Sequence, residues 1–495
     1  MKLRKEIKII MRNLTLLTDF YELTMMQAYH HAELTTGRKQ TAVFDMFYRE
    51  NPSGNGYVIM AGLAQLIDYI KELRFDEEEI SYLRSTGVFK EEFLEYLRGF
   101  KFTGTLYAVP EGTVTFPGEP IIRVTAPLLE AQLIETALLN IINHQSLIAT
   151  KASRVCWAAK GDRVLEFGLR RAQGPDAGLY GARAAMIGGC AATSNVLAGQ
   201  LFDVPIRGTH AHSWIMSFDS ELEAFRHYAE LYPNACILLV DTYDTLKSGV
   251  PNAIQVFNEM KGKGIPLQQY GIRLDSGDLA YLSKQARLML DEAGFTDAFI
   301  SASNDLDEYL IAELKAQDAQ ISVWGVGTHL ITSKEYPALG GVYKMAALST
   351  DDSEWIPKIK LSEDPIKVTN PGEKKIFRIY SADSGKMKAD LITLKEEEID
   401  ITQDLTIFDP IATWKRMTLK AGEYTVRELL EPVFVNGKCV YPNYSVKEIQ
   451  EYSEKERDTL WDEHKRLVRP QIMPIDLSQK LYDLKQCMIK TLRDN

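Results

Sequence analysis

The middle of the chain, from about residue 160 to 345, repeats short apolar and β-branched runs that each end in polar residues or glycine. Most runs precede a stretch with helical spacing, and the repeat recurs roughly every 20 to 40 residues, as in strand–helix units. Such units form either a barrel or an open doubly wound sheet. Polar residues follow nearly every run, which favours a barrel. The runs are RVLEFGLRR, VPIRGTHAH, CILLVDTYD, YGIRLDSGD, AFISASND, SVWGVGTH and GGVYKMAA.

The flanking parts of the chain mix helical and strand patterns. TDFYELTMMQAYHH has helical spacing, whereas AVFDMFYR is typical of a strand. We therefore predict an α/β protein with an irregular or incomplete α/β barrel, an N-terminal α+β domain and a small C-terminal α/β appendage. The predicted boundaries are 1–145 for the N-terminal domain, joined by strands from 350–390, 146–349 for the barrel with the active site, and 391–495 for the appendage.

The amino-acid composition argues against several kinds of binding partner and structural site. The 57 basic and 68 acidic residues give a net charge of -11, which argues against binding to nucleic acid or to an anionic membrane. The five cysteines are widely spaced without a C-x-x-C pair, so neither a structural zinc site nor a disulfide framework is expected. We expect reduced thiols in a cytoplasmic protein.

The polar residues after the runs are expected to converge, because a barrel gathers its working groups at the carboxyl ends of its strands. They combine cations suited to phosphate with carboxylates suited to Mg²⁺ and sugar hydroxyls. Each also has a structural alternative, such as a buried ion pair for Glu166 with a neighbouring arginine. The set is Glu166, Arg170, Arg171, His210, His212, Asp241, Asp244, Arg273, Asp275, Asp278, Ser303, Asn304, Asp305, Gly327, Thr328 and Lys344.

Two glycine-containing strand ends have ligand-binding character. In GIRLDSGD, Asp275 and Asp278 bracket a tight turn and are candidate Mg²⁺ ligands, although Asp278 fits equally well as the cap of the following helix. In WGVGTH, Gly327 and Thr328 offer backbone and hydroxyl donors to a phosphate. No G-x-x-x-x-G-K-[ST] sequence occurs, which excludes a P-loop. ILLVDTYD lacks the adjacent acidic pair of the other phosphoribosyltransferase class, so Asp241 is interpreted as the end of a buried strand.

RGTHAHSW places His210 and His212 two residues apart after a strand-like run. Metal chelation is the least favoured interpretation because no compact set of further ligands accompanies them. A structural pair is a second possibility. The interpretation that we favour is that one ring acts as a nucleophile or proton carrier.

In combination, TDFYELTM, EFGLRRAQGPDAG, GTHAHSW, IRLDSGDL and GVGT, in this order, closely resemble nicotinate phosphoribosyltransferases, barrel-type enzymes of NAD synthesis. The resemblance extends to about residue 380. It implies that nicotinate is joined to 5-phosphoribosyl 1-diphosphate to give nicotinate mononucleotide and diphosphate. It also implies coupling to ATP hydrolysis through a phosphohistidine at His212, Mg²⁺ as cofactor, and a homodimer with shared active sites.

Residue roles follow from the resemblance and from the chemistry. Tyr21, from the partner subunit, and Phe167 would stack on the pyridine ring. Asp275 would act in catalysis near Mg²⁺ or the ribose hydroxyls, and the neutral Asn195 would favour the acid over the amide. The other expected substrate contacts are Arg170, Thr209, Arg273, Ser303, Asn304, Gly327 and Thr328.

Three alternatives remain open. Quinolinate phosphoribosyltransferase has the same broad fold, but its chains are shorter and its second substrate carboxylate calls for a larger basic cluster. Nicotinamide phosphoribosyltransferase would differ in the preferred substrate. A non-catalytic ligand-binding protein could also retain the barrel, although candidates for every catalytic role are present.

Overall fold

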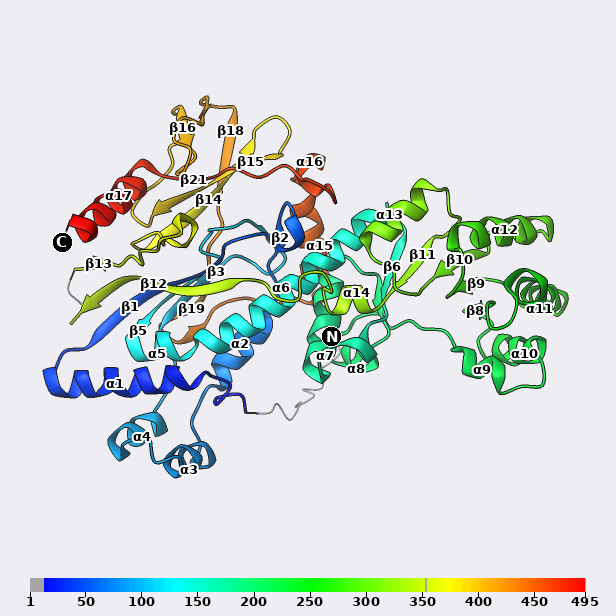
Figure 1. The fold of residues 1–495 in the computed structure, drawn as a ribbon, viewed down its shortest axis with the longest axis horizontal. Helices are drawn as coiled ribbons and strands as arrows, with labels where there is room; N and C mark the ends of the chain where they lie inside the picture. Colours follow the sequence, from blue (N-terminus) through cyan, green and yellow to red (C-terminus); the bar gives the residue numbers. More distant parts are fainter. Residues whose placement is uncertain (1–12, 352–353, 495) are drawn as a thin grey trace.

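An antiparallel sheet and a parallel sheet form the two main parts of the molecule, and the long helix α6 (Glu135–Ala158) packs against elements of both (Figure 1). The computed structural model describes residues 13–351 and 354–494, so the first 12 residues of the predicted N-terminal domain lie outside the described residues. Among the helices of these described ranges, none is long and apolar enough to cross a membrane.

The parallel sheet confirms the predicted incomplete barrel. β6 pairs with β11, so the strands are arranged in the order of a barrel, but β7 and β8, at the two ends of the sheet, do not pair with each other in the described structure. This leaves one open seam. Residues 205–207 begin to fill this seam through a parallel bridge between Thr193 and Ile206. In spatial order the strands are β7 (Ala192–Thr193), β6 (Arg163–Glu166), β11 (Val323–Val326), β10 (Phe299–Ala302), β9 (Tyr270–Leu274) and β8 (Cys236–Leu239).

Helices follow the parallel strands along the chain, and the last of them, α14, leads to β12 of the antiparallel sheet. Buried apolar residues of these helices and strands form one hydrophobic core. The helices are α7 (Pro175–Ile187), α8 (Val196–Phe202), α9 (His212–Met216), α10 (Glu221–Leu231), α11 (Val250–Gly262), α12 (Leu279–Glu292), α13 (Glu308–Ala316) and α14 (Thr328–Ile331).

The antiparallel sheet contains one strand that we had assigned to the barrel. β12, which contains all of the run GGVYKMAA except its first glycine, pairs along its length with β1. An apolar run has the same local pattern in either sheet, so only the tertiary partner distinguishes them. The strands in spatial order are β13 (Ile356–Pro357), β12 (Gly341–Thr350), β1 (Gln40–Tyr48), β5 (Ile122–Pro127), β3 (Thr105–Ala108), β19 (Glu431–Val435) and β20 (Lys438–Cys439).

Five helices and a small two-stranded sheet complete this half of the molecule, which has its own apolar core. The helices are α1 (Phe20–Thr36), α2 (Leu63–Glu72), α3 (Glu77–Ser85), α4 (Glu91–Arg98) and α5 (Leu128–Leu133), and the small sheet joins β2 (Val58–Ile59) to β4 (Val114–Thr115).

The C-terminal region differs from the predicted domain organisation in two respects. Most of the predicted 350–390 strands do not join the N-terminal sheet: only β13 does, while β14 (Lys374–Ser381) and β15 (Met387–Leu394) form a separate sheet with β18 (Tyr424–Glu428) and β21 (Ile475–Leu477). The region 391–495 is not self-contained either, because β19 pairs with β3. Its other elements are β16 (Leu405–Phe408), β17 (Arg416–Leu419), α15 (Val446–Asp458), α16 (Asp462–Lys465) and α17 (Gln479–Asp494).

A buried ion cluster ties this third sheet to α15. Arg378 on β14 is fully buried and bonds Asp390 on β15 (2.6 Å) and Glu456 on α15 (3.0 Å). Burial and the nearby Asp390 carboxylate raise the pKa of Glu119 well above its ordinary value. Arg378 is therefore the main cation facing several buried acidic groups.

Candidate active site

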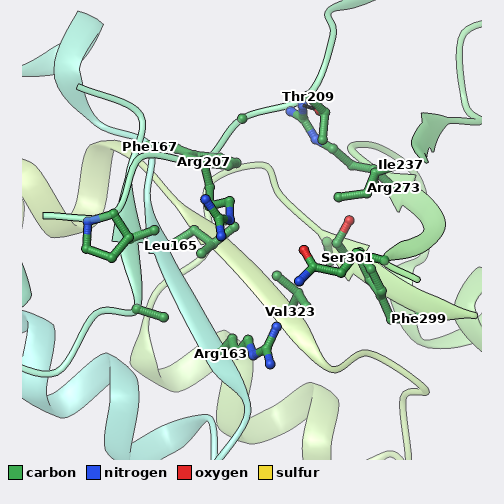
Figure 2. Close-up of a pocket in the computed structure, with 17 residues that line it drawn as sticks. Arg163, Leu165, Phe167, Arg207, Thr209, Ile237, Arg273, Phe299, Ser301 and Val323 are labelled. Atoms are coloured by element: carbon green, nitrogen blue, oxygen red, sulfur yellow. Dashed lines mark hydrogen bonds between the residues drawn. The ribbon is translucent and has the colours of Figure 1, made fainter. Parts of the chain in front are cut away.

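A cavity of about 310 Å³ lies inside the curled parallel sheet (Figure 2). Three arginines, Arg163, Arg207 and Arg273, lie on its wall, and no aspartate or glutamate of the described ranges does. A largely apolar cavity with cations and without carboxylates suits a flat organic anion. The wall consists of Arg163, Leu165, Phe167, Ala191, Ala192, Pro205, Arg207, Gly208, Thr209, Ile237, Gln269, Arg273, Phe299, Ser301, Ala302, Val323 and Gly325.

Phe167 supplies an aromatic surface at the carboxyl end of β6. Its ring occupies space that a side chain on β11 would need, because a Cβ added to Gly325 would lie 2.7 Å from Phe167 Cδ2. The guanidinium carbon of Arg273 lies 5.9 Å from the ring centroid. The aromatic surface and a cation thus share one end of the cavity.

Arg273, on β9, is held by three side chains, from the ends of β9 and β10 and from the loop that follows residues 205–207. Its guanidinium donates hydrogen bonds to Ser303 Oγ (2.8 Å), Thr209 Oγ1 (2.9 Å) and Asp275 Oδ1 (3.0 Å). The Ser303 hydroxyl also donates to Asp275. The structure therefore brings together four of the predicted site residues.

Asp241 connects this cluster to His212. Its Oδ1 lies 3.3 Å from His212 Nε2, and its Oδ2 accepts hydrogen bonds from the Asp275 backbone N–H (2.8 Å) and the Ser276 hydroxyl (2.7 Å). The sequence analysis included Asp241 among the polar residues expected to converge at the strand ends but assigned it no specific role. The available signal was its position directly after the apolar run CILLV, at the edge where the other site residues converge.

The two histidines of GTHAHSW have different environments. His210 is buried against Tyr228, with 4.6 Å between ring centroids, and its Nε2 accepts a hydrogen bond from the Leu239 backbone N–H (3.3 Å). Burial lowers the pKa of His210 to about 4, so the ring is neutral. The His212 side chain is 39% exposed. Only His212 therefore offers an accessible ring for chemistry.

The lowered pKa of His210 predicts that the free energy of unfolding depends on pH. Its folded pKa of about 4 lies below the ordinary value of 6.5, so the unfolded chain binds more protons between these values and stability falls as the pH drops through this window. The full loss is about 3 kcal/mol. The check is urea unfolding of wild type and His210→Gln. The wild type should lose free energy of unfolding from pH 7.5 to pH 5 relative to the variant, whose glutamine does not titrate, so its advantage should shrink. A constant difference would mean that His210 does not titrate in this window.

Two predicted site residues act as helix N-caps. Asn195 is buried, its Oδ1 accepts from the Ala198 backbone N–H (3.1 Å), and its Nδ2 donates to the Gly178 carbonyl (3.1 Å). Asp278 accepts from the Tyr281 backbone N–H (3.0 Å). Asn195 does not line the cavity and its amide is occupied, so the geometry does not support its predicted contact with substrate.

The remaining predicted residues lie outside the cavity wall. Arg170, Asn304, Gly327 and Thr328 follow strands β6, β10 and β11, so they lie at the same edge of the sheet as Arg273. Tyr21 belongs to α1 in the other half of the molecule and is 48% exposed.

Asp275 is the best candidate for holding Mg²⁺. Arg273 and Ser303 use its Oδ1, whereas its Oδ2 accepts no hydrogen bond from any described residue. Mg²⁺ commonly takes one or two carboxylates and completes its shell with water and substrate phosphates, so this donor set fits.

A second group of possible metal ligands lies beside the site. Ligand atoms of Asp307, His329 and Glu335 lie within 4.8 Å of one another. Lys151 Nζ already lies 2.6 Å from Glu335 Oε2, and His329 Nδ1 lies 2.7 Å from Glu335 Oε1. This group is better described as an ion-pair network than as a cation site.

Comparisons with known proteins agree on one family. The chain matches the model of the nicotinate phosphoribosyltransferase N-terminal domain over residues 16–143 and the C-terminal domain model over residues 373–485. It is 46% identical over 481 residues to the nicotinate phosphoribosyltransferase of Bacillus subtilis (strain 168), covering 97% of this chain and 96% of that protein. The Caenorhabditis elegans nicotinate phosphoribosyltransferase is 36% identical, with 94% and 92% covered.

Solved structures agree in fold. The crystal structure of human nicotinic acid phosphoribosyltransferase superposes with a TM-score of 0.82 at 29% identity, covering 96% of this chain and all of that one. A nicotinate-nucleotide pyrophosphorylase from Pyrococcus furiosus, at 22% identity and a TM-score of 0.68, shares the fold. The Bacillus match spans the parallel sheet, which lies between the two family-model matches and carries the site.

Proposed function

Because the chain belongs to the nicotinate phosphoribosyltransferase family, we propose that it joins nicotinate to 5-phosphoribosyl 1-diphosphate and forms nicotinate mononucleotide and diphosphate in NAD biosynthesis. One observation carries the proposal: the cavity has a cationic wall without a described carboxylate, and its wall residue Arg273 is linked by hydrogen bonds through Asp275 and Asp241 to His212.

Nicotinate fits the cavity in both shape and charge. The pyridine ring would stack on Phe167, and its carboxylate would meet a guanidinium group. At the carboxyl edge, Asp275, Ser303 and Asn304 would contact the ribose hydroxyls. Gly327, Thr328 and Arg170 would hold the phosphate groups of the donor.

The leaving diphosphate and the developing charge on the ribose carbon require fixed electrostatic partners. Arg273 cannot swing away easily, because three side chains hold it, so its charge is in place before the reaction. Mg²⁺, held through Asp275, would supply further neutralisation of diphosphate when bound.

His212 would be the residue phosphorylated by ATP. Donation from Nε2 to Asp241 leaves the lone pair on Nδ1, which we assign as the atom that attacks the γ-phosphorus while the bond to ADP breaks. The ring then becomes a phosphorylated imidazolium. The Asp241 carboxylate stabilises this positive charge and keeps the ring oriented.

Tyr21 would complete the site from a second copy of the chain. Within one chain it lies on α1, in the antiparallel half, and it does not line the cavity. We therefore propose a homodimer in which the partner's Tyr21 covers the open face of the pyridine ring. We also propose a cytoplasmic location, consistent with the five free cysteines.

The test is release of diphosphate from 5-phosphoribosyl 1-diphosphate with nicotinate, nicotinamide or quinolinate as acceptor. Nicotinate alone should support rapid release. Equal turnover of all three would refute the proposed pocket chemistry, preference for another acceptor would identify a different phosphoribosyltransferase, and no turnover with any of them would favour a ligand-binding protein.

A further inference from the structure

A buried cation, Lys151, connects the two segments that follow strands β10 and β11. Its Nζ lies 2.7 Å from Glu308 Oε2 and 2.6 Å from Glu335 Oε2, and its side chain is 6% exposed. Glu308 is the first residue of α13, after β10, whereas Glu335 follows α14, after β11. Lys151 itself belongs to α6, which contacts both α13 and α14 (Figure 1). One helix therefore fixes both segments relative to each other.

His329 extends this network to the start of α14. It directly follows Thr328, and its Nδ1 lies 2.7 Å from Glu335 Oε1 and 3.7 Å from Asp307 Oδ2. Glu335 therefore contacts His329 through one oxygen and Lys151 through the other. Although burial raises the pKa of Glu335, its bonds to Lys151 and His329 lower it to about 2, so the group is a carboxylate.

The segment after β10 has an uncommon backbone conformation that needs such support. Asn304 has a φ of 92° and Asp305 a φ of 33°, and both side chains are exposed. Positive φ values outside glycine store strain and persist only where the surrounding contacts hold them. Those contacts follow at once: Leu306 is fully buried, and Glu308 Oε1 accepts a hydrogen bond from Arg154 Nε (3.0 Å).

We propose that the network of Lys151, Glu335 and His329 positions the two segments that bind the phosphoribosyl donor, and so sets donor affinity without touching the donor. The inference rests on the proposed function, in which Asn304 and Thr328 contact 5-phosphoribosyl 1-diphosphate. The three network residues are not part of the cavity wall. Their loss should therefore weaken binding of the donor but not of nicotinate.

The test uses Glu335→Ala, because this side chain is 36% exposed. The buried Glu308 keeps both of its cationic partners, Lys151 and Arg154. The Kd and the KM for 5-phosphoribosyl 1-diphosphate with Mg²⁺ should rise roughly 10- to 100-fold, as for other losses of groups that orient a binding residue. The KM for nicotinate should change less than about threefold. Glu335→Gln, which can accept from Lys151 and donate to His329 Nδ1, should restore most of the donor affinity.

Asp162→Ala is the matched control. Asp162 Oδ2 also accepts two hydrogen bonds, from Lys315 Nζ (2.6 Å) and Trp324 Nε1 (3.0 Å), and its side chain is 19% exposed. It directly precedes β6, so it lies at the opposite, amino edge of the parallel sheet. Its loss should lower the urea unfolding midpoint without changing the donor Kd.

The outcomes separate this inference from the proposed function. An unchanged donor Kd in Glu335→Ala would refute the positioning role. An equal loss of donor affinity in Asp162→Ala, or an equal rise in the KM for nicotinate, would also refute it, because either result indicates general destabilisation. If wild type binds the donor but does not turn over nicotinate, the proposed function is wrong, whereas the ratio of the donor Kd values still decides this inference. If wild type does not bind the donor, both are wrong.

Discussion

Replacement of His212 by alanine is expected to abolish formation of an acid-labile, base-stable phosphoprotein from labelled ATP and Mg²⁺. The accessible His212 ring carries its hydrogen bond to Asp241 on Nε2, so Nδ1 is the available nucleophile. The other histidine of this segment is not accessible, because the His210 ring is buried against Tyr228. The measurement is label retained on the intact protein after gel filtration.

Two further variants sharpen this prediction. His210→Ala should still be labelled, since its ring fills a structural position. Asp241→Asn should slow labelling roughly 10²- to 10⁴-fold, because the amide cannot stabilise the imidazolium that forms. Label that persists in His212→Ala but disappears in His210→Ala would move the phosphorylation to the other ring.

Replacement of Arg378 by methionine is expected to cost about 3–5 kcal/mol of folding free energy. Arg378 is fully buried, and its removal leaves Asp390 and Glu456 as buried carboxylates without their main cation. Burial and Asp390 already hold the pKa of Glu119 well above its usual range, whereas Arg378 opposes this shift, so loss of Arg378 leaves the acidic cluster without that compensation. The measurement is the shift in the urea unfolding midpoint at pH 7.5.

Arg427→Met is the matched control for this variant. Arg427 pairs with the same Glu456 (2.8 Å), but its side chain is 40% exposed. Its loss should cost no more than about 1 kcal/mol. Equal destabilisation by both substitutions would show that burial of Arg378 does not set its contribution.

The barrel and much of its functional edge could be predicted from the sequence. Short apolar runs ending in polar residues are a local signal, and the carboxyl ends of parallel strands converge by geometry alone. This is why Arg273, Asp275 and Ser303 were predicted to lie close together, and they do lie in one hydrogen-bonded cluster. Thr209, which also bonds Arg273, was expected only from the family resemblance.

The errors come from information that is not local. β12 resembles a barrel strand in its own pattern, and only pairing with β1 reveals its sheet. Asn195 was expected near the substrate from the family resemblance, and the structure shows in addition that its side chain caps α8 and bonds the Gly178 carbonyl, which a single position in the sequence does not reveal.

The central claim is tested most directly by chromatographic identification of the product formed from labelled nicotinate and 5-phosphoribosyl 1-diphosphate, with and without ATP, by the wild-type protein. We predict nicotinate mononucleotide in equal amount to diphosphate, formed faster with ATP and not from labelled nicotinamide at comparable concentration. Complete recovery of unchanged nicotinate, with ATP and Mg²⁺ present, would contradict the account.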